Sequence, residues 1–239
     1  MPITAIQPRR LYQQVADQLR ALIEDGEFVI GDRLPSERDL AEQLGISRPT
    51  VREALIALEV EGRIRIRVGS GIFVAPPRKS RPRAPDAIEG PFELLRARAF
   101  IEGALVQEAA ALATTADIAL LDALLAQMEG GIHASEETIA LDRDFHCAIV
   151  GILGNAVLVR FVGELFDQRI NPYFERLSSY FENNHTWGEA QDEHRAVRDA
   201  IAAKDGEAAK AAMRHHLQQS QRRFSLNFGE GRGVEEPAA

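Results

Sequence analysis

Asp142 and His146 lie four residues apart in LDRDFHCAIVG, a spacing that places both side chains on one face of a helix, one turn apart. A carboxylate and an imidazole in this arrangement can bind the same divalent metal ion. Two more histidines, His194 in DEHRAVRDAI and His216 in AAMRHHLQQS, occur in later segments with a helical pattern. Three imidazoles and one carboxylate are suitable ligands for zinc, nickel or another divalent transition metal. From spacing alone, packed or capping histidines are an equally good interpretation.

A second group of polar side chains begins at the start of an expected helix, in SRPTVREAL. A recognition helix presents its N-terminal side chains to the major groove, where one arginine can bond both O6 and N7 of guanine. An arginine early in the preceding helix would reach a phosphate or a neighbouring base, and a hairpin tip would follow the backbone into the minor groove. The candidates for DNA contact are Arg38, Ser47, Arg48, Thr50, Arg52, Arg67 and Gly69. The alternative for each arginine is an exposed helix surface on which it pairs with a nearby glutamate.

The elements that must position these residues begin with three helices and a hairpin. Apolar residues recur at helical spacing over residues 10–25, and Ser36 and Ser47 are suitable caps for two further helices that end at Gly45 and Gly62. Alternation from Ile64 to Val68, a glycine turn and a return through residues 72–74 then predict two strands. This order predicts a winged helix-turn-helix within residues 1–75.

The rest of the chain has a different pattern. Residues 76–91 are rich in proline and charge and are expected to form a linker. Residues 92–226 show helical periodicity without a strand pattern, and residues 227–239 are expected to be a disordered tail. The expected helices cover residues 92–113, 117–129, 135–152, 155–182, 188–203 and 206–226. The fold class is therefore mainly α, with the winged domain followed by an all-α antiparallel bundle.

Charge is divided unevenly along the chain. The formal net charge is −8 at pH 7, yet residues 1–83 hold 14 Lys and Arg against 11 Asp and Glu. The remainder holds 14 against 25. A basic first part suits contact with phosphates, whereas an acidic second part favours a ligand or a protein partner.

The apolar segments and the cysteine content of the chain indicate its compartment. The chain contains no run of about 18 apolar residues, and its start, MPITAIQPRR, lacks the apolar region of a secretory signal. Cys147 is its only cysteine, so no disulfide can form within the chain. We therefore expect a cytoplasmic protein without a membrane partner.

Residues 9–74 resemble the DNA-binding domain of the GntR family. The similarity is most specific in LPSERDLAEQLGISRPTVREAL and in the wing, GSGIFV. The resemblance implies that Arg38, Arg48, Thr50, Arg52 and Gly69 contact DNA. It also implies that a homodimer reads a short palindromic operator in double-stranded DNA.

LDRDFHCAIVGILGN, followed by DEHRAVRDAIAAKDGEAAKAAMRHHL, is similar to the helical effector domain (FCD type) of the FadR-like subgroup of GntR regulators. In many members of that subgroup the matching Asp and three His bind a metal. This implies that Asp142, His146, His194 and His216 are ligands here, with zinc or nickel as the expected ion. His215 could compete with its neighbour, although the register of the subgroup fits His216 better.

GPFELLRARAFIE, DQRINPYFERL and RRLYQQ resemble hexuronate regulators of sugar-acid catabolism, the ExuR and UxuR type. The resemblance places Arg98 at the effector pocket, where a guanidinium binds a carboxylate with two hydrogen bonds; a surface pair with Glu102 is the alternative. Asn155 could line the same cavity or only cap a helix. Arg169 and Tyr173 are candidates for binding hydroxyls or the carboxylate, with exposed helix surface as an equal alternative.

Together these features predict a transcription regulator, most simply a repressor, whose small carboxylate effector weakens DNA binding. An activator role stays open. A metal-dependent hydrolase is the alternative from another class, but the sequence has no H-E-x-x-H or G-x-S-x-G motif and no phosphate-binding glycine loop. A sensor of a different organic acid, or of the metal itself, is a third interpretation.

Overall fold

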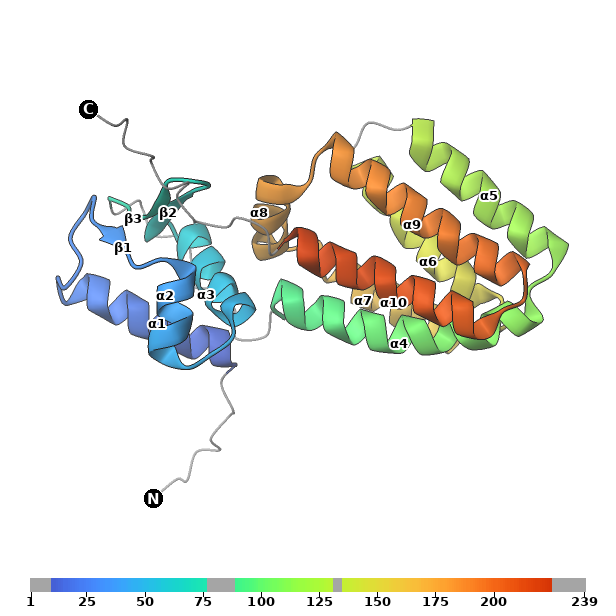
Figure 1. Ribbon diagram of the computed structural model, residues 1–239, viewed down its shortest axis with the longest axis horizontal. Coiled ribbons are helices and arrows are strands. Elements are labelled where there is room, and N and C mark those ends of the chain that lie inside the picture. Colours follow the sequence, from blue (N-terminus) through green and yellow to red (C-terminus); the bar gives the residue numbers. More distant parts are fainter. Residues whose placement is uncertain (1–9, 77–88, 131–134, 225–239) are drawn as a thin grey trace, which may run out of the picture. The chain divides into compact units, whose positions relative to one another are not determined.

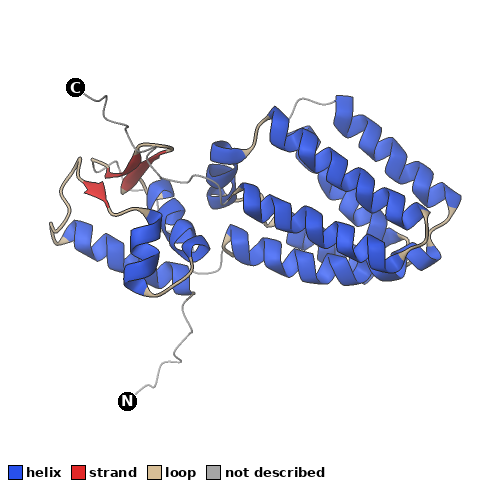
Figure 2. Cartoon of the chain, viewed as in Figure 1, coloured by secondary structure: helices blue, strands red, loops and turns tan. Residues whose placement is uncertain are grey.

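The computed structural model describes residues 10–76, 89–130 and 135–224, which form two compact units (Figures 1 and 2). One unit contains the described residues up to Gly90, and the other is Pro91–Phe224. Most of the expected linker and the whole expected tail lie outside the described residues. Within the described ranges, no helix combines the length and the apolar character that crossing a membrane requires.

The first unit has the predicted winged helix-turn-helix architecture. Its elements are α1 (Leu11–Glu24), β1 (Arg33–Leu34), α2 (Glu37–Leu44), α3 (Arg48–Val60), β2 (Ile64–Arg67) and β3 (Gly71–Val74). Helices α1 and α3 pack against each other, and Leu19, Leu55 and Leu58 are among the side chains buried in this core. The recognition helix α3 is therefore held along its length by apolar packing.

Two caps and one glycine define the turn between α2 and α3. The Ser36 hydroxyl accepts a hydrogen bond from the backbone N–H of Asp39, and the Asp39 carboxylate accepts one from the backbone N–H of Ser36. Helix α2 ends at Gly45, whose φ of 65° is in the left-handed region. The Ser47 side chain then caps α3 by accepting from the N–H of Thr50. As predicted, the first turn of α3 follows this tight turn.

The wing is a three-stranded antiparallel sheet in the order β1-β3-β2. The short strand β1 was not predicted, because two residues carry no periodicity. Ile66 pairs with Ile72 and both are buried, whereas Arg65 and Arg67 are on the exposed face of β2. The expected strand to Val68 was one residue too long, because the turn through Gly69 already begins at Val68.

The second unit is an all-helical bundle, as predicted. Its helices are α4 (Pro91–Leu112), α5 (Thr115–Gly130), α6 (Glu136–Gly151), α7 (Ala156–Asp167), α8 (Pro172–Phe181), α9 (Asn184–Ala202) and α10 (Gly206–Arg223). Helices α4 and α10 pack side by side and run in opposite directions (Figure 1). Their approach is close at Gly206, where an added Cβ would lie 2.7 Å from the carbonyl oxygen of Gln107.

The single helix expected over residues 155–182 is wrong: the chain forms α7 and α8 with a turn between them. The Asn171 side chain caps α8 by accepting hydrogen bonds from the backbone N–H groups of Tyr173 and Phe174. Pro172 occupies the first helical position, where its missing N–H costs nothing. The Asn-Pro step is thus a start signal, and it places Arg169 in the turn before α8.

Candidate functional site

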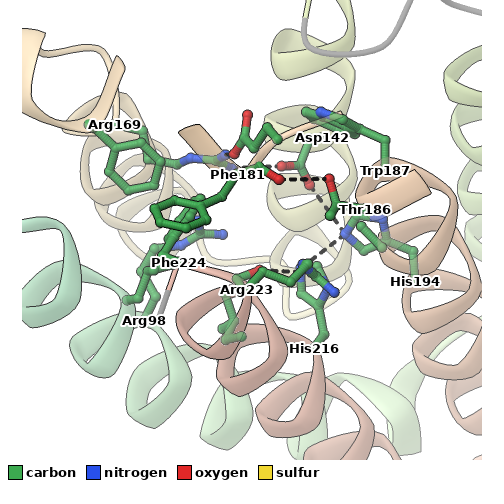
Figure 3. Close-up of a pocket in the computed structure, with 16 residues that line it drawn as sticks. Arg98, Asp142, Arg169, Phe181, Thr186, Trp187, His194, His216, Arg223 and Phe224 are labelled. Atoms are coloured by element: carbon green, nitrogen blue, oxygen red, sulfur yellow. Dashed lines mark hydrogen bonds and ion pairs between the residues drawn. The ribbon is translucent and has the colours of Figure 1, made fainter. Parts of the chain in front are cut away.

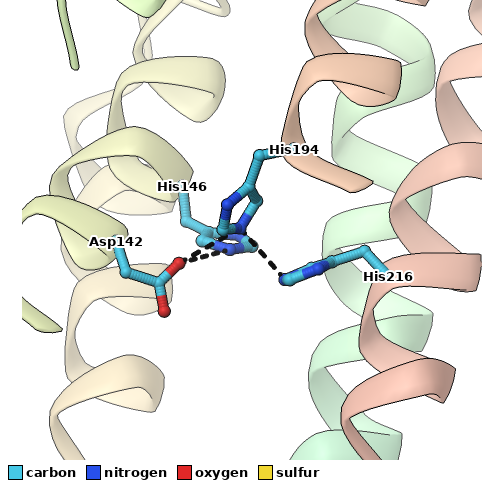
Figure 4. Close-up of side chains that lie close together, drawn as sticks. All are labelled: Asp142, His146, His194 and His216. Carbon is cyan, nitrogen blue, oxygen red and sulfur yellow. Dashed lines mark hydrogen bonds and ion pairs between the residues drawn. The ribbon is translucent and has the colours of Figure 1, made fainter. Parts of the chain in front are cut away.

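The four predicted metal ligands meet in the interior of the helical bundle (Figure 4). Helix α6 supplies Asp142 and His146, α9 supplies His194, and α10 supplies His216; all four side chains are buried. Nε2 of His194 lies 3.2 Å from Oδ1 of Asp142 and 3.1 Å from Nε2 of His216. One possible ligand atom from each residue lies within 4.8 Å of the others.

The donor atoms of this cluster fit a divalent transition metal. Oδ1 of Asp142 and Nε2 of His146 are 3.3 Å apart and buried, yet neither has a hydrogen-bond partner. Buried polar atoms without a partner are rare and require an explanation. Three imidazole nitrogens and one carboxylate oxygen directed at one point would all be satisfied by one cation.

Two glutamates hold the ligand imidazoles from behind. The Nδ1 of His146 bonds to Glu102, whose carboxylate also accepts from Nε of Arg98 at 2.6 Å. The Nδ1 of His216 lies 2.9 Å from Glu193. A carboxylate on Nδ1 fixes the ring so that the Nε2 lone pair is directed at the cluster.

These supporting contacts were not predicted from the sequence. Glu102 was expected only as a surface partner of Arg98, but both side chains are at most 2% exposed. Glu193 and Arg223 were not among the predicted residues, and they form a bidentate ion pair at 2.7 and 3.1 Å. The contacts of Glu102 with His146 and of Glu193 with His216 and Arg223 span 23 residues or more, so no local spacing reveals them.

Electrostatics keep two of the histidines in the neutral form that binds metals. Burial lowers the pKa of His194, and burial beside His194 and His146 lowers the pKa of His216 well below its usual value. Burial alone would raise the pKa of Glu102, but Arg98 and His146 lower it to about 2. Glu102 in turn raises the pKa of His146 despite burial.

A small pocket adjoins the cluster (Figure 3). Its wall includes Asp142, His194 and His216 together with two of the predicted effector residues, Arg98 and Arg169. Nη1 of Arg169 donates to Oδ2 of Asp142 at 2.8 Å. The cavity volume is about 40 Å³, room for about three water molecules. With Arg223, which also lines it, the pocket combines three guanidinium groups with a metal-type cluster.

The other predicted residues of the helical unit are placed differently. Asn155 caps α7 by accepting from the backbone N–H of Val157 at 3.0 Å. Tyr173 is 4% exposed, and neither it nor Asn155 lines the pocket. Their predicted contact with an effector thus has no support from geometry. The competition between the neighbouring histidines is resolved, because His216 is buried in the cluster and His215 is exposed.

The predicted DNA-reading residues lie on the first turn of α3, on α2 and at the wing. Ser47 and Thr50 share a hydrogen bond of 2.8 Å between their hydroxyls at the start of α3. The side chain of Arg38 on α2 is 74% exposed, and that of Arg48 is 44% exposed. Gly69 has a φ of 74° in the turn of the wing, where any side chain would be strained. The exposed residue Arg67 ends β2, directly before this turn.

Arg52 departs from the expectation that it shares an open helix face with Arg48. Its side chain is 2% exposed, and its Nε donates to Oε2 of Glu37 at 2.6 Å. Glu37 is fully buried and also accepts from Nε of Arg48 at 2.8 Å. The carboxylate of Glu37 thus joins the two arginines of α3 to α2, and Arg52 can reach DNA only by leaving it.

A helix-turn-helix unit binds DNA, and a pocket in the second unit can bind a small molecule. Together the two units define the class of ligand-responsive transcription regulators. Residues 11–74 match the family described as "Bacterial regulatory proteins, gntR family", and residues 93–219 match the FCD domain. The chain belongs to the GntR family and is a DNA-binding regulator with an FCD effector domain. Membership of a regulator family also argues against the metal-dependent hydrolase.

Similar proteins carry related names. The "Exu regulon transcriptional regulator" of Escherichia coli (strain K12) is 38% identical over 218 residues, covering 89% of this chain and 83% of that protein. The "Uxu operon regulator" of Haemophilus influenzae is 35% identical over 222 residues, covering 87% of this chain and 80% of that one. Among solved structures, E. coli McbR/YncC matches with a TM-score of 0.50 at 25% identity, over 90% of this chain and 97% of that one.

Proposed function

We propose that this regulator represses genes of sugar-acid catabolism and that a hexuronate, bound in the helical unit, releases it from DNA. The observation that carries this proposal is the placement of Arg98 and Arg169 in the same pocket as three of the four metal-type ligands, Asp142, His194 and His216. A planar guanidinium binds a carboxylate with paired hydrogen bonds, and a hexuronate carries one carboxylate and several hydroxyls. The names of the Exu and Uxu relatives support this class of effector.

The resident ion in this proposal is zinc or nickel, held by Asp142, His146, His194 and His216. Three nitrogens and one oxygen are a donor set that both ions accept. When bound, the ion would supply a Lewis-acidic centre that attracts oxygen atoms of the effector. Glu102 and Glu193 keep the imidazoles of His146 and His216 oriented for it.

The DNA-binding form is proposed to be a homodimer that reads a palindrome in the cytoplasm. Two copies of α3 would enter major grooves one helical turn apart, each with the first turn around Arg48 facing the bases. Arg38 and the wing residues Arg67 and Gly69 would contact the flanking backbone or the minor groove. Exposed apolar side chains of the helical unit support association, notably Phe100 at 72% and Val157 at 60%.

One observation favours a smaller acid as a second candidate. A cavity of about 40 Å³ is well below the roughly 300–1,000 Å³ of typical ligand pockets. A compact hydroxy acid needs less rearrangement of the pocket than a hexuronate. Both candidate acids carry a carboxylate that the guanidinium groups of the pocket can bind. The same experiment can therefore test both acids.

The test uses an operator selected from a random DNA library with the full-length, zinc-loaded protein. Binding of the labelled operator is followed by fluorescence anisotropy while D-galacturonate, D-glucuronate or a short hydroxy acid is added. We expect a hexuronate to release the DNA and the selected site to be palindromic. Release by the short acid alone would replace the hexuronate with the second candidate, and tighter binding of DNA would contradict the proposal that the effector releases the regulator.

A further inference from the structure

Arg169 has one guanidinium edge that lacks a close acceptor. Its Nη1 donates to Asp142 at 2.8 Å, but its Nε is buried without a hydrogen-bond partner, and its Nη2 is 3.5 Å from Oε1 of Glu182. Nε and Nη2 form the side of the guanidinium that can hold a carboxylate with two parallel hydrogen bonds. The rings of Phe166 and Phe174 lie 4.9 Å from its Cζ and fix the plane of the group.

Glu182 is a carboxylate of the chain itself at this edge. It lies directly after α8, whereas Arg169 lies in the turn three residues before α8, so their ion pair joins the two ends of the helix. The Glu182 side chain is 15% exposed, and burial raises its pKa even though Arg169 opposes the shift. Glu182 is thus a poorly solvated carboxylate in a loose pair, which another carboxylate could replace.

A second, larger cavity also borders these residues. Its volume is about 580 Å³, within the range of about 300–1,000 Å³ that is typical of ligand pockets. It shares Arg169, Phe174 and Glu182 with the pocket beside the histidine cluster, and the rest of its wall comes mainly from α6 and α8. The remaining wall residues are Glu136, Ile139, Ala140, Arg143, Phe166, Asp167, Ile170, Glu175, Ser178 and Ser179.

We infer that the two cavities are one effector site divided by the Arg169–Glu182 pair, and that the carboxylate of the effector takes the place of Glu182 on Arg169. The hydroxylated body of the sugar acid then extends into the larger cavity, where Ser178, Ser179 and carboxylates supply hydrogen-bonding groups and Phe174 supplies an apolar face. Because Glu182 competes with the effector, it sets the affinity of the site. This inference rests on the proposed function and adds the position of each part of the ligand.

The first test removes the competing charge with Glu182→Gln in the full-length, zinc-loaded protein. Isothermal titration calorimetry with D-galacturonate should show a Kd about tenfold lower, because one charge-assisted hydrogen bond no longer has to be exchanged. The methyl ester of D-galacturonate has no carboxylate and should gain nothing from the substitution. Glu164→Gln is the matched control, since its side chain is 67% exposed and lines neither cavity.

The second test fills the larger cavity without touching the ion pair. Ala140 is exposed on α6 and lines that cavity, so Ala140→Trp should weaken binding of D-galacturonate tenfold or more while zinc affinity stays unchanged. Ala126→Trp, at an exposed position of α5 outside both cavities, should leave the Kd unchanged.

The outcomes separate this inference from the proposed function. If the wild-type protein binds neither D-galacturonate nor D-glucuronate, the proposed effector is wrong and the inference falls with it. If the wild-type protein binds a hexuronate but Glu182→Gln leaves its Kd unchanged or raises it, Glu182 is not a competitor. If Ala140→Trp has no effect on the same Kd, the larger cavity is not part of the site. Either of the last two results overturns the inference and leaves the function intact.

Discussion

The imidazole of His216 and the carboxylate of Glu193 lie 2.9 Å apart, from Nδ1 to Oε2, although the residues belong to α10 and α9. The same carboxylate accepts two hydrogen bonds from Arg223 at 2.7 and 3.1 Å. The proposed metal ligand His216 is therefore oriented by a carboxylate that is itself fixed by a guanidinium. This arrangement makes the affinity of the proposed site for a metal depend on residues that do not contact the ion.

The first prediction concerns this supporting carboxylate. Glu193→Gln should lower zinc affinity by about 10- to 100-fold, because the imidazole of His216 loses its negatively charged partner. Competition with a chromogenic chelator measures the affinity, and circular dichroism checks the fold. Glu189→Gln is the control, because Glu189 is 3.8 Å from Arg223 and its side chain is 48% exposed. Equal zinc affinity in the two variants would show that Glu193 has no role in the site.

A second prediction concerns removal of the metal. Chelation should lower the melting temperature of the wild-type protein, because an ion that binds only the folded state stabilises it by mass action. The His194→Ala variant should melt lower than the wild type and respond little to the chelator. His185→Ala is a suitable control, since this side chain is 84% exposed and lies outside the cluster. A chelator effect of equal size in wild type and His194→Ala would place the ion elsewhere.

Local patterns predicted the parts of the structure that depend on neighbouring residues. The serine caps of α2 and α3 and the alternation in β2 are properties of a few consecutive residues. The pairing of Asp142 with His146 also follows from one helical turn. The meeting of these two with His194 and His216 came from the family resemblance, because periodicity does not say which helices adjoin.

Contacts between distant segments were beyond the reach of sequence periodicity. Arg52 is one position after the buried Val51, and only the packing of α2 on α3 decides that its guanidinium is enclosed with Glu37. The position of the second guanidinium edge of Arg169 depends on the turn before α8, which the single expected helix did not contain. That turn could have been predicted, since the Asn171-Pro172 step is a known helix start.

A third prediction concerns acid sensitivity at the start of α2. Hydrogen bonds from Ser36 lower the pKa of Asp39 below its usual value. A carboxylate with a lowered pKa stabilises the folded state above its unfolded pKa, and this stability is lost as the pH falls through the folded value. Asp39→Asn should therefore melt below the wild type at pH 6, and the difference should shrink below about pH 4.

Thermal melts of the full chain at both pH values measure this difference. Ser36→Ala removes the hydroxyl that donates to Asp39 but keeps the backbone N–H of Ser36, so it should reduce the pH dependence without abolishing it. A gap between wild type and Asp39→Asn that is constant with pH would mean that the charge of Asp39 contributes nothing.

The last prediction separates the two arginines of α3. Arg52→Ala should destabilise the DNA-binding unit by about 3–5 kcal/mol, because it leaves the buried carboxylate of Glu37 with a weaker set of partners. Arg48→Ala should change stability by no more than about 1 kcal/mol, since its side chain is 44% exposed. The same variant should weaken operator binding by about 1–3 kcal/mol and relax preference at one base position.

Urea unfolding and anisotropy titrations on the selected operator give both quantities. The double variant Arg52→Ala with Glu37→Gln should regain part of the lost stability, because the stranded charge is gone. If Arg52→Ala remained fully stable and lost operator binding, Arg52 would act on DNA rather than on Glu37. Its guanidinium would then have to leave Glu37 when DNA binds, and the Glu37 carboxylate would be a competitor of the bases for the same arginine.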